Sequence, residues 1–361
     1  MDKIKIGITH GDINGVGYEL ILNTFEVEEM TSVCTPVIYG SPKVATYHRK
    51  AIGNQANFQV IDSADLAKEG NVYMVNCFGE EEQKIELGQA SDEAGKAALI
   101  ALNQALEDLK SGKIDALVTA PINNDTITLE SGEAFKGQTA YIEGVAGEGK
   151  QALKVFISNN IRIAVATDKI PVSEVAQNIT RDVLAEKLVI LHNTLKRDFY
   201  IDNPRIAVLA LNPNANGKEE QEIISPVIDE LFKRGVRCMG PYAADDFFGS
   251  GNFDHFDATL AMYYDQGVAA FKALTQHEGV NYTAGLPIIR TAPAIGVCYE
   301  IAGKAETDEQ SFRQAIYVAV DTIRNRARFD KERSNPLRKQ YFEKRDDSDK
   351  LKLDQVTEEE N

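Results

Sequence analysis

Short apolar runs rich in β-branched residues recur along most of the chain, and stretches with apolar residues at helical spacing separate them. This alternation is typical of βα units, in which helices connect parallel strands and cover the sheet. The sequence therefore predicts an α/β protein with a largely parallel sheet. The predicted strands are residues 4–9, 35–39, 71–76, 114–119, 154–157, 161–167, 205–211 and 258–263.

The clearest helical signal covers residues 91–110. Ser91 is a suitable N-cap, the acidic Asp92 and Glu93 suit the positive end of a helix, and Gly112 follows the last turn. Apolar residues at helical spacing predict a packing face. That face consists of Ala94, Ala98, Ala101, Ala105 and Leu109. Further helices are predicted over residues 181–196, 219–234 and 308–324.

With 361 residues, the chain exceeds the size at which a single core usually stops growing, which predicts two lobes. From about residue 328 onward, apolar periodicity gives way to mixed charge, which is typical of a disordered segment. We therefore divide the chain into a folded unit of residues 1–327 and a charged, flexible C-terminal tail of residues 328–361.

The formal net charge of −16 argues against nucleic acid as a partner, because phosphate backbones require a basic surface. No apolar run approaches the ~20 residues that a membrane span requires. The four cysteines lie far apart without a CxxC pair, which favours reduced thiols. The chain begins with a strand rather than a signal segment. Together these features predict a cytoplasmic protein without membrane or nucleic-acid partners.

A glycine-rich loop, residues 11–17 (GDINGVG), follows the first predicted strand but lacks the GxGxxG spacing of a dinucleotide loop. Four further segments follow it in order: residues 119–123 (TAPIN), 211–213 (LNP), 264–267 (YDQG) and 279–290 (GVNYTAGLPIIR). Together the five segments resemble the 4-hydroxythreonine-4-phosphate dehydrogenase family of vitamin B6 synthesis.

This resemblance implies an isocitrate-dehydrogenase-like fold of two α/β lobes, with largely parallel sheets and a cleft between the lobes. One lobe would contain both ends of the folded unit, and the other the middle of the chain. It also implies a homodimer that uses NAD. The implied reaction oxidises the hydroxyl of a phosphorylated hydroxy-amino acid, and the resulting β-keto acid then loses carbon dioxide.

The resemblance further implies that Lys272, Asn281 and Arg290 hold the substrate, including its phosphate. Their chemistry agrees, because arginine offers a planar fork of donors, lysine a mobile charge and asparagine an amide donor. The family's histidine–threonine pair, which meets the substrate, corresponds here to Gln138 and Thr139. We therefore expect a phosphorylated small molecule as the ligand.

Three metal-binding histidines of the family correspond here to Lys169, Asn214 and Tyr264. An ammonium cannot bind a metal, and an amide or a phenol is a poor substitute for imidazole with zinc-like ions. Asp245 and Asp265 are present, but two carboxylates favour only weak, magnesium-like binding. We therefore expect no tight divalent metal and consider Lys169, Asp245 and Asp265 as the candidate catalytic residues.

The family's His-Gly-Thr segment near the adenine of the dinucleotide corresponds to Ile295, Gly296 and Val297. Isoleucine removes the polar contact that a histidine ring provides, so NAD binding is expected to be weakened at these residues.

Three functions stay open from the sequence. The first is the family's dehydrogenase reaction, which the substitutions predict to be reduced or absent, because the metal would stabilise the developing negative charge. The second is a metal-independent dehydrogenase in which Lys169 supplies the missing positive charge. The third is a non-catalytic homologue that binds a phosphorylated ligand or regulates a partner.

Overall fold

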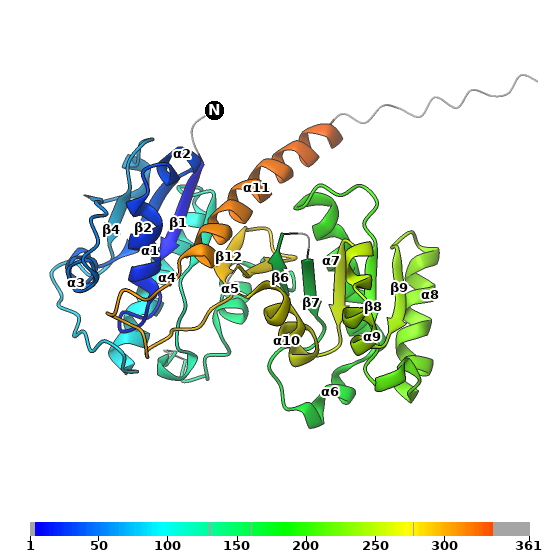
Figure 1. Ribbon diagram of the computed structural model, residues 1–361. Coiled ribbons are helices and arrows are strands. Elements are labelled where there is room, and N and C mark those ends of the chain that lie inside the picture. The colour runs from blue at the N-terminus through cyan, green and yellow to red at the C-terminus, as the bar shows by residue number, and fades with distance from the viewer. Residues whose placement is uncertain (1–3, 130, 160, 277, 335–361) are drawn as a thin grey trace, which may run out of the picture.

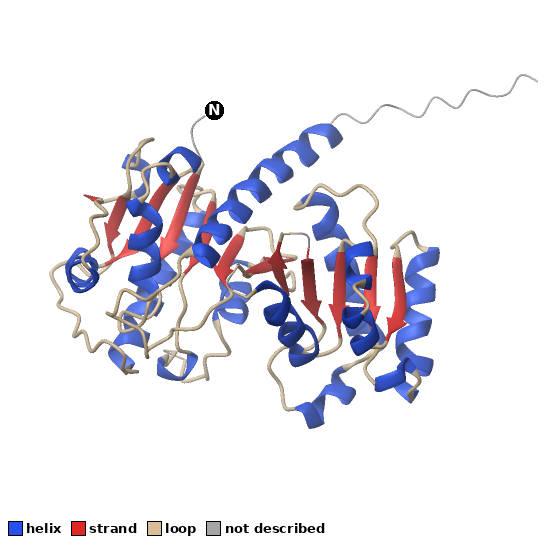
Figure 2. Ribbon diagram, in the orientation of Figure 1, coloured by secondary structure: helices blue, strands red, loops and turns tan. Residues whose placement is uncertain are grey.

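The computed structural model describes residues 4–129, 131–159, 161–276 and 278–334. In these residues one continuous 12-stranded sheet runs through the molecule, and helices cover both of its faces (Figures 1 and 2). Its strand order is β3-β4-β2-β1-β5-β12-β11-β6-β7-β10-β8-β9.

The strands are β1 Lys5–Thr9, β2 Thr35–Gly40, β3 Gln59–Ile61, β4 Tyr73–Asn76, β5 Ala116–Thr119, β6 Leu153–Ser158, β7 Ile161–Val165, β8 Ile206–Leu209, β9 Cys238–Tyr242, β10 Ala258–Ala261, β11 Val280–Ala284 and β12 Arg290–Pro293. The α-helices are α1 Gly17–Glu26, α2 Met30–Val33, α3 Pro42–Ile52, α4 Asp92–Lys110, α5 Gln138–Ala146, α6 Val172–Asn178, α7 Arg181–Arg197, α8 Ser225–Lys233, α9 Ala244–Gly249, α10 Tyr264–Thr275 and α11 Gln310–Arg333.

The sheet is parallel on both sides of an antiparallel centre. The antiparallel pairs are β12–β11, β11–β6 and β6–β7, and the remaining pairs are parallel. The C-terminal elements β12 and α11 pack beside β5 and β1, so late and early segments of the chain share one half of the sheet. The predicted largely parallel α/β fold is confirmed.

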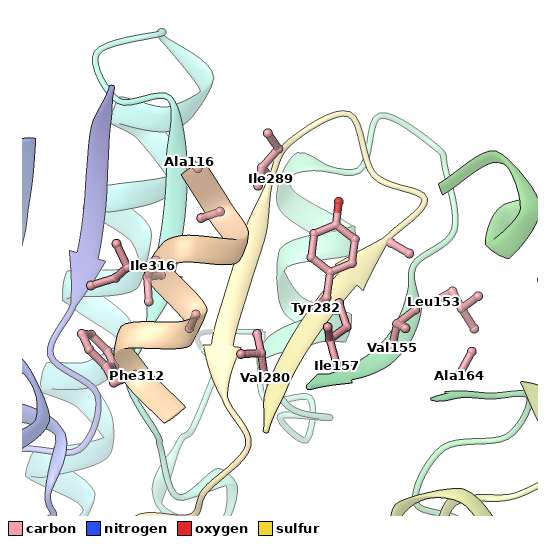
Figure 3. Packing of buried hydrophobic residues seen from close by; sticks show 14 of the residues in the cluster. Ala116, Leu153, Val155, Ile157, Ala164, Val280, Tyr282, Ile289, Phe312 and Ile316 are labelled. Carbon is pink, nitrogen blue, oxygen red and sulfur yellow. The ribbon is translucent and has the colours of Figure 1, made fainter. Parts of the chain in front are cut away.

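The two faces of the central strands have different environments. One face packs against α11 and α7 and is apolar, as Figure 3 shows for Val155, Ile157, Val280 and Tyr282. Neighbouring residues along a strand point to opposite faces. The residues between these, including Lys154 and Asn281, therefore face the opposite side, which is flanked by α5 and α10.

A buried hydrogen-bond network joins helix α11 to strand β11 on the apolar face of the sheet. Arg326 donates from Nε to Asp198 Oδ1 at 2.6 Å and from Nη1 to the carbonyl of Pro287 at 2.6 Å. Tyr282 donates its hydroxyl to the other Asp198 oxygen at 2.6 Å. Since Tyr282 lies between Asn281 and Thr283 in β11, this network also fixes the strand that carries those two residues.

The predicted strands are confirmed with ends that differ by at most two residues, and the predicted helices are confirmed in position, except that the helix predicted to end at residue 324 continues to Arg333. Ser91 caps α4 by accepting from the backbone N–H of Ala94, as predicted. The predictions omitted β3, β9, β11 and β12. Helix α11 continues to Arg333, beyond the boundary predicted at residue 327, and the tail from residue 335 lies outside the described residues. In the part of the chain that the structure describes, no helix is both long and apolar enough to cross a membrane.

Candidate anion-binding site

The guanidinium of Arg290 is buried at the start of β12, where it donates hydrogen bonds only to neutral groups. Nε and Nη2 donate to the hydroxyl of Thr119 at 3.1 and 2.6 Å, and Nη2 also donates to Gln138 Oε1. Nη1 donates to the hydroxyls of Thr139 and Thr283 at 3.4 and 3.2 Å. The structure therefore joins the predicted Gln138, Thr139 and Arg290 in one cluster.

This arginine carries a buried positive charge without a carboxylate partner among the described residues. Burial lowers its pKa to about 10, so it is still a cation at neutral pH. Transferring a charge out of water is costly unless an opposite charge compensates it. The environment of Arg290 therefore favours an anionic ligand.

Sheet register extends this cluster to Lys154. Thr283 on β11 pairs with Lys154 on β6, and directly opposite residues of antiparallel strands share a face. The side chain of Lys154 is 15% exposed, and its ammonium lies 2.5 Å from Asp168 Oδ2. Burial lowers the pKa of Lys154, pairing with Asp168 opposes this, and the charges of Arg290 and Lys169 lower the pKa further. Lys154 thus belongs to the same electrostatic cluster.

Asn281 lies two residues before Thr283 on β11, on the same face of the sheet, and pairs with Phe156 of β6. Its Oδ1 atom is buried without a hydrogen-bond partner in the described residues. Lys272 is exposed on α10, where its charge lowers the pKa of the Cys298 thiol, although burial raises that pKa overall. No hydrogen bond or ion pair of the described residues joins Lys272 to Asn281 or Arg290, so the structure does not draw these three predicted residues into direct contact.

Lys169 is an exposed residue in the segment that follows β7, and its Nζ lies 5.4 Å from the centre of the Tyr264 ring. That ring packs edge-on against Phe156, with centroids 5.9 Å apart. Burial, together with the charges of Asp168 and Asp265, raises the pKa of the Tyr264 phenol, so it is a neutral hydroxyl. Within the described residues, neither Asp245 nor Asp265 forms an ion pair with Lys169.

Asn214 is exposed in the short helical turn Pro213–Ala215 and has a positive φ of 62°. The loop around it is shaped by Glu220, whose carboxylate accepts from the backbone N–H groups of Leu211, Asn212 and Gly217 at 2.7–2.8 Å. Burial alone would raise the pKa of Glu220, but these hydrogen bonds outweigh it and lower the pKa. Glu220 is therefore a loop-ordering carboxylate.

These residues do not fit a tight transition-metal site. Lys169 engages the Tyr264 ring instead of presenting a lone pair, and Asn214 offers only an exposed amide. Among the described residues, no group of three or more histidine, cysteine, aspartate or glutamate side chains is arranged to hold a metal ion. The donor chemistry at the three positions therefore disagrees with the family's imidazole set.

The glycine-rich loop is fixed to the segment that contains Ile295, Gly296 and Val297. Val16 donates its N–H to the carbonyl of Val297 at 3.1 Å, and Tyr299 donates its hydroxyl to Asp12 Oδ2 at 2.7 Å. A Cβ atom on Gly15 would lie 2.7 Å from that Val297 carbonyl oxygen, so the close approach requires glycine. Ile295 and Val297 have apolar side chains, so this segment offers hydrogen bonds only through its backbone.

His10, which immediately precedes the same loop, is fully buried. Its ring stacks on Tyr18 with centroids 5.0 Å apart and an interplanar angle of 6°. Burial lowers its pKa to about 3, so it is neutral at ordinary pH. His10 is a packing residue beneath the loop.

The chain is thus an α/β protein with a buried arginine among neutral hydrogen-bond partners on the sheet face flanked by α5 and α10. Residues 32–319 match the family model described as pyridoxal phosphate biosynthetic protein PdxA. The chain belongs to this family.

Relatives and solved structures agree with this assignment. The chain is 56% identical to the 4-hydroxythreonine-4-phosphate dehydrogenase of Bacteroides thetaiotaomicron over 99% of both chains, and 33% identical to that of Aquifex aeolicus over 88% of this chain and 98% of the relative. The crystal structure of a 4-hydroxythreonine-4-phosphate dehydrogenase from Burkholderia phymatum has a TM-score of 0.72 and 30% identity, covering 89% of this chain and 98% of that chain. The Klebsiella pneumoniae enzyme, with 24% identity, has the same fold, with a TM-score of 0.76 over 89% and 99% of the two chains.

Sequence reasoning missed Lys154, Asp168, Thr119 and Thr283. Only Lys154 carries a usable signal, because it is a charged residue within the otherwise apolar strand segment LKVFIS. A lysine at a half-buried strand position needs a partner, and that requirement indicates a site. The threonines carry no such signal, because threonine is common in strands.

Proposed function

We propose that this protein binds a phosphorylated small acid of the kind named in its relatives' activity, 4-hydroxythreonine-4-phosphate. The observation that carries this proposal is the buried guanidinium of Arg290, whose hydrogen-bond partners are all neutral. A phosphate would supply the missing counter-charge and would exchange with the weakest present partner, the Thr139 hydroxyl at 3.4 Å. Asn281, with its unpartnered Oδ1, and Lys272 are proposed to contact the remainder of the ligand.

We further propose that the metal-dependent oxidation of the substrate by NAD is reduced or absent in this protein. When bound, NAD would accept a hydride from the carbon that carries the substrate hydroxyl, and the hydroxyl itself would lose its proton. Ile295, Gly296 and Val297 provide apolar and backbone contacts for a dinucleotide, and the Val297 carbonyl is already engaged by Val16. The activity is expected to fall for two reasons, because each lowers the stabilisation of the transition state. One is the weak contact with the cofactor, and the other is the poor metal donors Lys169, Asn214 and Tyr264.

A second candidate function is a metal-independent dehydrogenase. It is favoured by the position of Lys169, whose ammonium lies over Tyr264 near Asp168 and Lys154. In this candidate, the cation stabilises the negative charge that develops when the substrate hydroxyl loses its proton. Asp245 and Asp265 are its proposed supporting carboxylates, although both are exposed.

Thermal unfolding in the presence of a chelator tests the binding function. A ligand at ~100 times its Kd adds ~2.7 kcal/mol to the free energy of unfolding. We expect 4-hydroxythreonine-4-phosphate to raise the Tm and 4-hydroxythreonine, which lacks the phosphate, to leave it unchanged. Equal shifts with both compounds, or none with either, would contradict the proposal.

The same samples distinguish the two candidates when NAD is added. The binding function predicts no NADH above background in chelator. The metal-independent dehydrogenase predicts NADH formation that survives the chelator and disappears in Lys169→Ala. Lys187→Ala is a matched control, because Lys187 lies on α7 and donates to the backbone carbonyl of Ala152.

We also propose that the protein is a cytoplasmic homodimer. The resemblance to the family supports the dimer. The four cysteines support the compartment, because no disulfide joins them in the described residues.

A further inference from the structure

Positive charge is concentrated on one small part of the sheet in a chain whose net charge is −16. Arg290, Lys154 and Lys169 lie close enough that the charges of Arg290 and Lys169 both act on the Lys154 ammonium. Asp168 is the acid paired with Lys154, and its side chain is 51% exposed. Because half of the Asp168 side chain is exposed, this acid stays hydrated when it separates from Lys154, whereas the mostly buried Lys154 needs another anion in its place.

The register of the sheet sets the distance between the two buried cations. Arg290 begins β12 and Lys154 lies on β6, with Thr283 of β11 between them. Adjacent strands are ~4.8 Å apart, so the two backbones are separated by about 10 Å. Both side chains lie on the face flanked by α5 and α10, and Thr283 already accepts a hydrogen bond from Arg290. Thr283 therefore lies between the two cations on the same face of the sheet.

We propose that Lys154, with Lys169 beside it, forms a second anion subsite that takes the carboxylate of a small acid whose phosphate is held by Arg290. This inference rests on the proposed function and adds the opposite end of the ligand. Asp168 uses one of the three N–H donors of the Lys154 ammonium, which leaves donors for a carboxylate. Tyr264 contributes a neutral hydroxyl near the same cluster.

A purely structural role for Lys154 makes a different prediction. If the ion pair only anchors the segment after β7, breaking it from either side should affect ligand binding alike. If Lys154 binds a carboxylate, the negative charge of Asp168 beside it repels the ligand. Lys154→Met should then weaken binding, and Asp168→Asn should strengthen it.

The experiment is a calorimetric titration in chelator with two probes. O-phosphoserine carries a phosphate and a carboxylate, whereas O-phosphoethanolamine is the same compound without the carboxylate. We expect the wild type to prefer O-phosphoserine about tenfold or more, the effect of one hydrogen bond to a charged group. Lys154→Met should remove that preference by weakening O-phosphoserine alone. Lys150→Met, at an exposed residue just before β6, is the matched control and should behave as wild type.

The possible results distinguish failure of the proposed phosphate binding at Arg290 from failure of the second subsite at Lys154. Failure of both probes to bind the wild type, or unchanged binding of both in Arg290→Met, contradicts the proposed function itself. Loss of both probes in Arg290→Met, with the preference intact in Lys154→Met, overturns only the second subsite. An equal loss of both probes in Lys154→Met, a wild type without preference, or weakening by Asp168→Asn also overturns it. Thermal unfolding of each variant verifies that it is folded.

Discussion

Replacing Arg326 by methionine should lower the free energy of unfolding by about 3–5 kcal/mol, the usual cost of leaving a buried charge without its partner. Arg326 and Asp198 form a bidentate pair at 2.6 and 3.0 Å, and their side chains are 10% and 4% exposed. Methionine would fill much of the volume but would leave the Asp198 carboxylate with Tyr282 as its remaining side-chain donor. Urea-induced unfolding measures the loss.

Arg324→Met provides the matched control for this prediction. Arg324 is on the same helix, but it is exposed and forms only a 3.7 Å pair with Asp321, so its replacement should change stability by less than about 1 kcal/mol. Combining Arg326→Met with Asp198→Asn should recover part of the loss, since the orphaned charge is then removed. Equal stability of Arg326→Met and Arg324→Met would show that the network does not fix α11 and β11.

Replacing Arg290 by methionine should weaken binding of 4-hydroxythreonine-4-phosphate at least ~30-fold, because truncating one partner of a buried charged pair costs 2–5 kcal/mol or more. The unliganded protein should lose less stability than Arg326→Met does. Thr119 and Gln138 still hydrogen-bond to each other at 2.7 Å, and no carboxylate is orphaned. The measurement is the ligand-induced change in Tm, compared between wild type and variant.

Arg162→Met is the control for this variant. Arg162 is a half-buried arginine on β7 that pairs with Ile157, so it belongs to the opposite face of the sheet, where it packs on the Phe199 ring at 4.7 Å. Its replacement should leave the ligand-induced Tm change intact. A similar loss in both variants would mean that the effect is general destabilisation and not the loss of an anion contact.

The architecture could be predicted from the sequence where the local residue pattern matches the way the element packs in the fold. Buried parallel strands such as β1 and β5 are short apolar runs, and α4 carries both its cap and its stripe of small residues. The omitted strands lack these signals. β3 is short and mostly exposed, and β11 and β12 lie within one motif-like segment interrupted by Gly285 and Pro287. Their pairing depends on long-range register, which a local pattern does not contain.

The candidate site could be predicted only in part, because its assembly also depends on long-range strand pairing. The segment from Gly279 to Arg290 indicated an anion site, and Arg290 does have the environment of one. The pairing of β12, β11 and β6 places Lys154 on the same face as Arg290 and gives Arg290 only neutral partners. A local sequence pattern does not contain this pairing. The expectation that Lys272 and Arg290 hold the same ligand came from the family resemblance, and no hydrogen bond or ion pair of the described residues joins the two side chains.

We propose that this family member holds its phosphorylated ligand through Arg290 without a metal ion. Isothermal titration of 4-hydroxythreonine-4-phosphate, performed once in chelator and once with added zinc or magnesium, tests it most directly. We predict saturable binding with the same Kd in both conditions, together with no stoichiometric metal in the purified protein by elemental analysis. Binding that requires the metal, or one tightly held transition-metal ion per chain, would contradict metal-free binding through Arg290.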